Sequence, residues 1–181
     1  MKAPGFPLEI SASLKPATGM RDWLQEVVLF SALTGGLLRV MHPELYTAGI
    51  QALGLLAAAP EHVKEGDDVL AILEVWSSPF SSYSIISNRT TPVHRDNTSR
   101  PAWYDMLVTL GTYEDGIFGL PGVGLSFRYG PGSVVALCGK LLKHEVPEVK
   151  GDRVCFAFYM RDKVHDRLHI PAPGWMHVNY Y

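Results

Sequence analysis

The stretch YDMLVTLGTY, residues 104–113, sets the fold class. It is rich in β-branched and aromatic residues and gives way to turn-forming residues, which is typical of a short strand. Similar runs lie on both sides of it: VLAILEVW (69–76), SYSIISN (82–88), GLSFRY (124–129), SVVALCG (133–139) and DRVCFAFYM (152–160). Because Gly, Pro, Asn and Asp separate these runs, we expect a β-region of about eight short strands.

The chain before this region has a helical pattern. Apolar residues recur at helical spacing from Met20, and Gly35 and Gly36 predict that this helix ends there. Pro43 suits the first turn of a second helix, which Pro60 would stop. We therefore expect a lead-in and supporting helices over residues 1–68 and a core over residues 69–181, within a single domain overall.

The predicted fold class is α+β and mainly β. Helices followed by many short strands favour a double-stranded β-helix, also called a jelly roll, with the N-terminal helices packed on one sheet. Periodicity alone leaves open a second architecture, a mixed α+β domain with an open antiparallel sheet. The first 19 residues, which are rich in proline and glycine, are expected to form an extended lead-in.

Composition and charge limit the possible partners and the cellular compartment. The formal net charge of −2 and the pI near 6.4 give no overall attraction to a polyanion, although a local basic patch can still provide one. Cys138 and Cys155 lie in apolar runs, where a free thiol behaves as a small buried hydrophobe, and this favours a reducing, intracellular compartment. The apolar runs are far shorter than the roughly 20 residues that cross a bilayer, so we expect no membrane partner.

A candidate metal site begins in TPVHRD, residues 91–96. His94 and Asp96 are two positions apart, so on a strand both side chains would project from one face. His144, in LLKHEV, lies in a strand-like run that a jelly roll could bring opposite this pair. Two imidazoles and one carboxylate occupy one face of an octahedral iron and leave the other positions open, as non-haem Fe(II) oxygenases require. A His-x-Asp pair by itself is often only a hydrogen-bonded surface pair.

Arg153 opens the strand-like run that follows His144. A guanidinium inside a barrel can bind the carboxylate of a cosubstrate in a bidentate manner. Period-two counting puts Arg161 on the same face, so it is also eligible, and we favour Arg153 because it lies nearer His144 in the sequence. The alternative is that both arginines lie at strand ends in solvent, as most arginines do.

Four stretches together resemble one family. They are ISNR (86–89) leading into TPVHRD, then RPAWYDMLVTLGTY (100–113), FRYGPGSVVALCGKLLKHEV (127–146) and GDRVCFAFYMRDKVHDRL (151–168). These stretches are similar to the TET/JBP class of 2-oxoglutarate oxygenases, especially to its fungal members associated with transposons. The resemblance implies that His94, Asp96 and His144 hold Fe(II) and that Arg153 binds 2-oxoglutarate.

Two more residues enter the cosubstrate site through this resemblance. Cys155 stands where related enzymes often have a serine beside the arginine, a departure that could loosen cosubstrate binding. Asn88 would face the pocket, or else cap the end of the strand before TPVHRD.

The resemblance also implies a substrate, because the family oxidises methyl groups on nucleobases. We expect a dioxygenase that converts 5-methylcytosine in DNA to 5-hydroxymethylcytosine and further, in the nucleus, with N6-methyladenine demethylation as the alternative. A base in duplex DNA would have to be flipped out of the stack. The candidates for stacking or phosphate contact are Arg95, Trp103 and Tyr104, followed by Phe127, Tyr129, Arg100, Arg128 and Lys143, with core packing as the alternative for the rings.

Two further functions stay open on the sequence. One is an oxygenase that acts on a small molecule or a protein side chain, and the other is an inactive jelly-roll binding module. The slight negative charge weakens the DNA interpretation, as does the absence from this sequence of the basic or cysteine-rich region that larger relatives have upstream.

Overall fold

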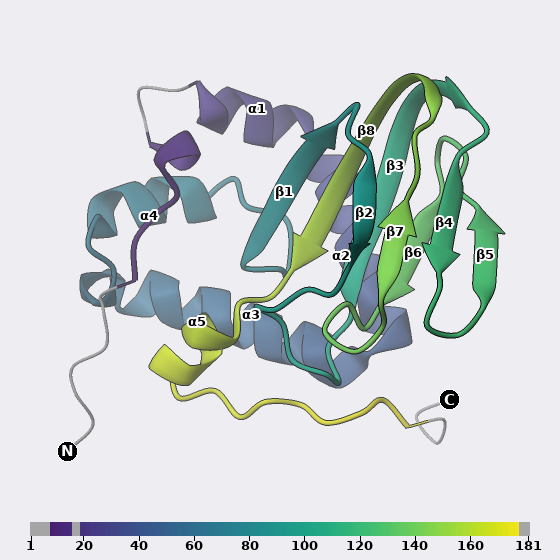
Figure 1. Cartoon of the computed structure of the whole chain (residues 1–181). Helices are drawn as coiled ribbons and strands as arrows, with labels where there is room; N and C mark the ends of the chain where they lie inside the picture. Colours follow the sequence, from purple (N-terminus) through teal and green to yellow (C-terminus); the bar gives the residue numbers. More distant parts are fainter. Residues whose placement is uncertain (1–7, 16–18, 178–181) are drawn as a thin grey trace. The chain divides into compact units, whose positions relative to one another are not determined.

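The computed structural model describes residues 8–15 and 19–177, except for the side chain of His62. The chain forms two compact units, a helical unit (Met1–Ser81 with Lys163–Pro173) and a strand unit (Ser82–Asp162 with Gly174–Tyr181). Figure 1 shows the elements of both. The lead-in expected at residues 1–19 falls partly outside the described residues, and its described part holds a short 3-10 helix, η1 (Ala12–Leu14).

The helical unit departs from the sequence prediction at its first helix. Instead of one helix that stops at the glycines, there are α1 (Met20–Glu26) and α2 (Val28–Met41), which meet at a bend of 61°. The predicted stop at Gly35 and Gly36 is therefore wrong, because α2 runs through both. Packing explains why a glycine occupies position 35, because a Cβ there would lie 2.5 Å from Pro79 Cδ. The glycine admits a packed proline and does not end the helix.

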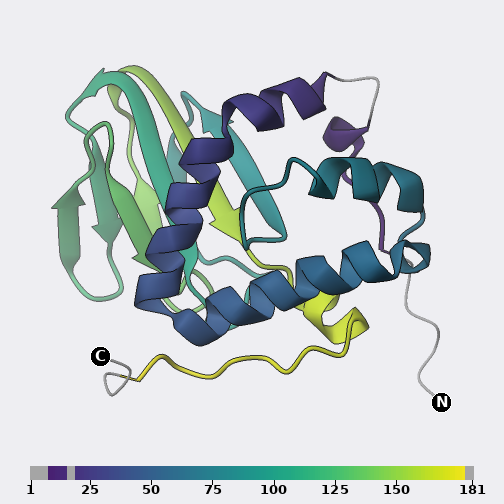
Figure 2. The same cartoon turned by 180° about the vertical axis from the view of Figure 1, so that it is seen from behind.

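The second predicted helix is confirmed as α3 (Pro43–Ala58), which meets α2 at a sharp corner (Figure 2). Pro43 stands in its first turn, and the His42 Nδ1 atom accepts a hydrogen bond from the Leu45 N–H at 3.3 Å. Within the described residues no single helix is long and apolar enough to cross a bilayer, and only the bent pair of α1 and α2 passes that test together.

The run VLAILEVW is not a strand. Its first residues belong to α4 (Gly66–Leu73), whose first turn carries Asp67 and Asp68, acidic groups that stabilise a helix N-terminus. Val69 is buried, with Ile72 and Leu73 packed beside it in one apolar cluster. The helical spacing of these three residues fits one face of α4. A short apolar run does not distinguish a strand from a buried helix, which is why this prediction was wrong.

The strand unit has two four-stranded antiparallel sheets, in the order β1-β8-β3-β6 and β2-β7-β4-β5. The strands are β1 (Ser82–Ser87), β2 (Thr91–His94), β3 (Asp105–Glu114), β4 (Ile117–Leu120), β5 (Leu125–Arg128), β6 (Val134–Leu137), β7 (His144–Val146) and β8 (Lys150–Tyr159). The mainly-β jelly roll is thus confirmed, and an open single sheet is not what forms. The short β4 was not predicted. The domain boundary at residue 68 and the packing of helices on one sheet stay predictions.

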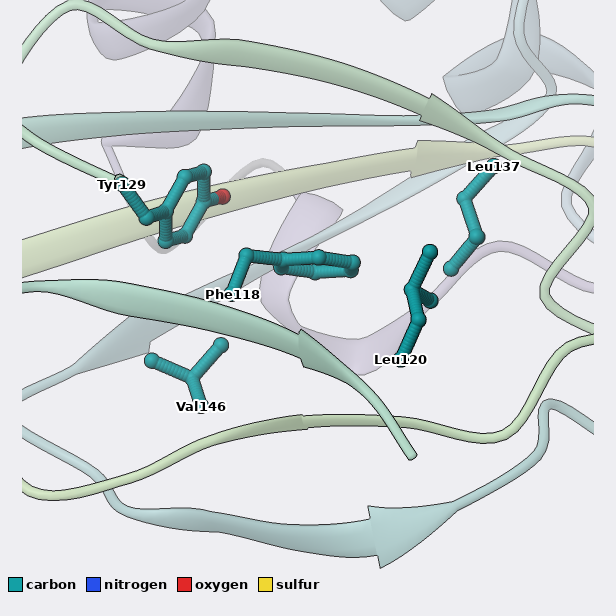
Figure 3. Packing of buried hydrophobic residues seen from close by; sticks show 5 residues of the cluster. All are labelled: Phe118, Leu120, Tyr129, Leu137 and Val146. Atoms are coloured by element: carbon teal, nitrogen blue, oxygen red, sulfur yellow. The ribbon is translucent and has the colours of Figure 1, made fainter. Parts of the chain in front are cut away.

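The core of the strand unit lies between its two sheets. Phe118 and Leu120 of β4 and Val146 of β7 point from one sheet, and Leu137 of β6 points from the other, with Tyr129 completing the cluster (Figure 3). All five side chains are buried, so this layer fixes the spacing of the sheets whose inner faces carry the candidate site.

Candidate functional site

His94 and His144 face each other across two neighbouring strands. They are register partners of β2 and β7, and their ring centroids lie 4.1 Å apart. The His94 Nδ1 atom lies 2.9 Å from the Pro92 carbonyl oxygen, and the His144 Nδ1 atom lies 3.1 Å from that of Leu142. A carbonyl oxygen only accepts hydrogen bonds, so in each neutral imidazole the Nδ1 atom carries the proton and the Nε2 atom has a free lone pair.

Asp96 completes the cluster from a loop and not from a strand. β2 ends at His94, so same-face counting along a strand does not explain how Asp96 is placed. Its backbone N–H instead donates to the Gly139 carbonyl at 3.0 Å. The carboxylate lies 3.6 Å from the Nε2 atom of each histidine, and the three ligand atoms all lie within 4.8 Å of one another. The structure thus brings together the three residues named from the sequence, and their role as metal ligands stays a prediction.

The two histidines differ in exposure. The His144 side chain is only 5% exposed and stacks against Phe118 at 5.9 Å between centroids, whereas His94 and Asp96 are each 37% exposed. Burial lowers the pKa of His144, which favours the neutral imidazole that a metal needs. A metal held here would be enclosed on the His144 side and open on the side of His94 and Asp96.

Arg153 is a buried cation on β8. Its Nε donates to Thr109 Oγ1 at 3.2 Å, one terminal nitrogen donates to the Arg89 carbonyl at 3.4 Å, and the guanidinium lies 5.3 Å from the centre of the Tyr129 ring. Arg153 is 2% exposed, and within the described residues these partners are all neutral. A buried charge without a counterion is costly, and a bound carboxylate would remove that cost.

A chain of ring contacts links Arg153 to the metal cluster. The Tyr129 ring lies under the guanidinium at 5.3 Å and 5.4 Å from the Phe118 ring, which in turn stacks on His144. Figure 3 shows Tyr129 and Phe118 side by side between the sheets. Tyr129 was expected as a possible base-stacking residue, but its side chain is completely buried and forms part of this chain of contacts.

Thr109 and Tyr113 were not predicted from the sequence. Both lie on β3, beside β8, and the Tyr113 hydroxyl lies 2.9 Å from Thr109 Oγ1 and donates to the Tyr129 carbonyl at 2.7 Å. Tyr113 thereby helps to orient the Thr109 hydroxyl group, which accepts a hydrogen bond from Arg153 Nε. The available signal was their spacing, since alternate residues of β3 must face the same side as Arg153 once the two strands are paired.

The other residues expected around the cosubstrate are placed differently. Cys155 is buried, with its Sγ 3.6 Å from the Tyr129 hydroxyl, and desolvation raises its pKa, so it is a neutral neighbour of Arg153. Asn88 is exposed at a positive φ of 47°, and its side chain accepts from the Arg153 N–H at 2.7 Å and donates to Asp152 at 3.1 Å. Asn88 thus acts as the strand-end cap that was its alternative interpretation.

Arg161 lies at the other end of β8. It is exposed, donates to Ser82 Oγ at 3.4 Å and to the Tyr159 hydroxyl at 3.3 Å, and lies over the Tyr159 ring. It is eight residues beyond Arg153 and two beyond the end of β8, which along an extended chain is up to roughly 26 Å. The structure therefore separates Arg161 from the buried arginine that the prediction grouped with it.

The residues expected to contact the substrate differ in their exposure. Arg95 is exposed, and its Nε donates to the Leu141 carbonyl at 3.0 Å. Trp103 is 1% exposed with the Arg100 guanidinium 5.1 Å above its ring, so in this conformation it offers no open face to a base. Tyr104 is half-buried, whereas Phe127, Arg128 and Lys143 are exposed.

Comparison with known proteins found a matching family profile and a similar solved structure. A family profile named Tet_JBP, described as the oxygenase domain of the 2OGFeDO superfamily, matches residues 7–162. No match was found among curated proteins. A solved structure described as NgTET1 in complex with 5mC DNA is similar to this chain, with a TM-score of 0.59 and 15% sequence identity over 87% of this chain. The similar region spans 57% of the NgTET1 chain.

Proposed function

The chain belongs to the Tet_JBP family of 2-oxoglutarate/Fe(II) oxygenases, and from this premise we propose that it oxidises a methyl group on a nucleobase in DNA. The preferred substrate in this proposal is 5-methylcytosine, converted to 5-hydroxymethylcytosine and further. The observation that carries the proposal is the pairing of a His-Asp-His cluster with a buried arginine that has only neutral partners.

Iron fits the residues that the fold gathers. In their neutral forms His94 and His144 would present Nε2 lone pairs and Asp96 a carboxylate, which is the donor set that suits Fe(II) with open coordination positions. When bound, the iron supplies the activation of dioxygen that oxidises 2-oxoglutarate and the substrate methyl group. The protein supplies the ligands, and Phe118 shields His144 from water.

The cosubstrate in this proposal is held by Arg153. The distal carboxylate of 2-oxoglutarate would form a bidentate ion pair with the guanidinium, while Thr109 fixes its Nε and Tyr129 supports its face. Cys155 lines the same buried region without adding a charge. Because Arg153 has no charged partner of its own among the described residues, a dicarboxylate can neutralise it without displacing one.

DNA as the partner is supported by where the charges lie. The overall charge is −2, but residues 82–162 have nine Lys and Arg against eight Asp and Glu, so the acidic excess belongs to the helical unit. The similar NgTET1 structure contains 5mC DNA, which supports the choice of base. A flipped base would approach the open side of the cluster, beside the partly exposed His94 and Asp96, with exposed Arg95 near the phosphates.

The test is a turnover assay with defined DNA. Protein purified without oxygen is given Fe(II), 2-oxoglutarate and air, together with oligonucleotides that contain 5-methylcytosine, N6-methyladenine or only unmodified bases. Mass spectrometry measures succinate and oxidised base. We expect oxidised 5-methylcytosine together with DNA-dependent succinate.

Two variants control this assay. His94→Ala removes a ligand and should abolish both products, whereas His177→Ala, which removes an exposed histidine elsewhere, should leave both unchanged. Succinate without any oxidised base would retain the oxygenase and reject DNA as its substrate. Oxidation of N6-methyladenine alone would change the assigned base.

A further inference from the structure

Gly139 lies directly behind the Asp96 carboxylate. A Cβ built at Gly139 would overlap Asp96 Oδ2, and it would also lie 2.7 Å from Asp105 Oδ2. Its φ is outside the left-handed region that only glycine enters readily, so the backbone itself would tolerate a side chain. Space for the two carboxyl groups is therefore what excludes a side chain at this position.

Hydrogen bonds join the turn that contains Gly139 to the loop that contains Asp96. The turn, residues 138–142, is closed by the Leu141 and Leu142 N–H groups, which donate to the Cys138 carbonyl at 2.9 and 3.0 Å. Asp96 N–H donates to the Gly139 carbonyl at 3.0 Å. Arg95 donates to the Leu141 carbonyl and Lys140 Nζ to the Asn97 carbonyl at 2.8 Å. The Asp96 backbone is thus held by the turn on which its carboxylate rests.

Asp105 closes the far side of the same space. It is 4% exposed, its Oδ1 accepts from Ser99 Oγ at 3.2 Å, and its Oδ2 has no hydrogen-bond partner within the described part of the chain. Two carboxyl groups, one of them buried, therefore border the space that a side chain at Gly139 would need. Close packing around Gly139 therefore leaves the Asp96 carboxylate little room to move.

We propose that Gly139 is a positioning residue for the metal site. Because Gly139 has no side chain, the Asp96 carboxylate can occupy the space beside it and stay next to the two histidines. This inference rests on the proposed function for the identity of the metal, but not for the fit between Gly139 and Asp96. It assigns a role to a residue that binds neither metal nor substrate.

The first test is metal affinity. Purified apoprotein is titrated with Co(II) under nitrogen, and the visible absorption of the bound ion is recorded. Gly139→Ala should weaken Co(II) binding by about 10- to 100-fold and change the band shape, as loss of ligand support does. Gly130→Ala is the matched control, because a Cβ there meets nothing within 4 Å, and it should bind as the wild type does.

The second test needs no metal. In EDTA, melting temperatures are measured for Gly139→Ala, Asp96→Ala and the double variant. We expect Gly139→Ala to lower the melting temperature, and to lower it much less when the Asp96 side chain is already absent, with part of the loss remaining because Asp105 still faces the added methyl group. If Gly139→Ala alone does not fold, the double variant should regain a cooperative transition.

The outcomes separate the two proposals. Wild-type Co(II) affinity in Gly139→Ala, or strictly additive melting temperatures, would overturn the positioning role and leave the proposed enzyme untouched. Failure of the wild type to bind Co(II) or Fe(II) would overturn the proposed function. A coupled pair of melting temperatures would then still establish that Gly139 makes room for Asp96.

Discussion

Arg153 differs from Arg161 in its environment, and this difference predicts which arginine binds the cosubstrate. Arg153 and Arg161 share a strand and a face by sequence counting, yet one is 2% exposed with neutral partners and the other lies in solvent. Substitution should distinguish them. Arg153→Met should raise the KM for 2-oxoglutarate at least about tenfold, since a charge-assisted hydrogen bond contributes roughly 1.5–3 kcal/mol.

The same measurement contains its controls. Arg153→Lys should fall between wild type and Arg153→Met, because an ammonium keeps the charge but loses the bidentate geometry. Arg161→Met should change the KM less than twofold. A larger effect from Arg161 than from Arg153 would contradict the assignment of the cosubstrate site.

Asp105 gives a pH-dependent prediction at the residue scale. Burial, and then the nearby Asp96 carboxylate, raise the pKa of Asp105 from 3.8 to about 7. The folded state therefore holds this proton more tightly than the unfolded state, and the stability that this provides is lost as the pH rises from about 4 through 7. In metal-free protein, the free energy of unfolding of Asp105→Asn relative to that of wild type should therefore be about 2 kcal/mol higher at pH 8 than at pH 5.

Urea unfolding at both pH values measures this difference. Asp115→Asn is a suitable control, because Asp115 is exposed and its positive φ of 58° is one that asparagine also adopts. It should shift stability equally at pH 5 and pH 8. An Asp105→Asn variant with no pH-dependent change would show that this carboxyl group titrates normally in the folded protein.

What the sequence could predict at this scale depended on residue chemistry. His94, Asp96 and His144 were named because two imidazoles and one carboxylate suit Fe(II) and because the stretches around them resemble one family. The support of Asp96 by Gly139 was not, since it depends on a turn and a loop more than 40 residues apart in the sequence meeting in space. Thr109 and Tyr113 were missed for a similar reason, because a buried threonine and a buried tyrosine also occur in an ordinary core.

At the scale of elements, α2 provides a matched pair of neighbouring glycines. A Cβ at Gly35 would press against Pro79 at 2.5 Å, whereas a Cβ at Gly36 would meet nothing within 4 Å. Gly36→Ala should stabilise the protein by about 0.5–1 kcal/mol through helix propensity alone. Gly35→Ala should destabilise it by about 1–3 kcal/mol through overpacking. Chemical denaturation of the two variants checks the opposite signs.

The length of an element also decides whether its sequence pattern predicts it. The long strands β3 and β8 were predicted because their alternation and β-branched content extend over ten residues each. The four-residue β4 was missed because so short a run between two turns has little pattern of its own. The α4 segment was assigned to a strand because its apolar run is compatible with both structures until its partners in the apolar cluster are known.

For the whole molecule, the site should couple metal binding to folding. His94 and Asp96 are separated from His144 by about half of the strand unit, so a metal that binds all three holds distant segments together. At a metal concentration 100 times Kd, binding should stabilise the fold by about 2.7 kcal/mol. Differential scanning fluorimetry with and without Co(II) should show a higher melting temperature for wild type and no change for His94→Ala.

The sheet order has a consequence for the growing chain. All strands of the sheet that contains His94 and His144 have been synthesised once Val146 has been added. The other sheet must wait for β8, because β1 pairs with no strand but β8 among those described. On a translating ribosome, the residues of the proposed metal site therefore leave the exit tunnel before Arg153, the proposed cosubstrate-binding residue. The last strand to emerge is β8, which pairs with both β1 and β3 and so completes the sheet that carries the buried Arg153.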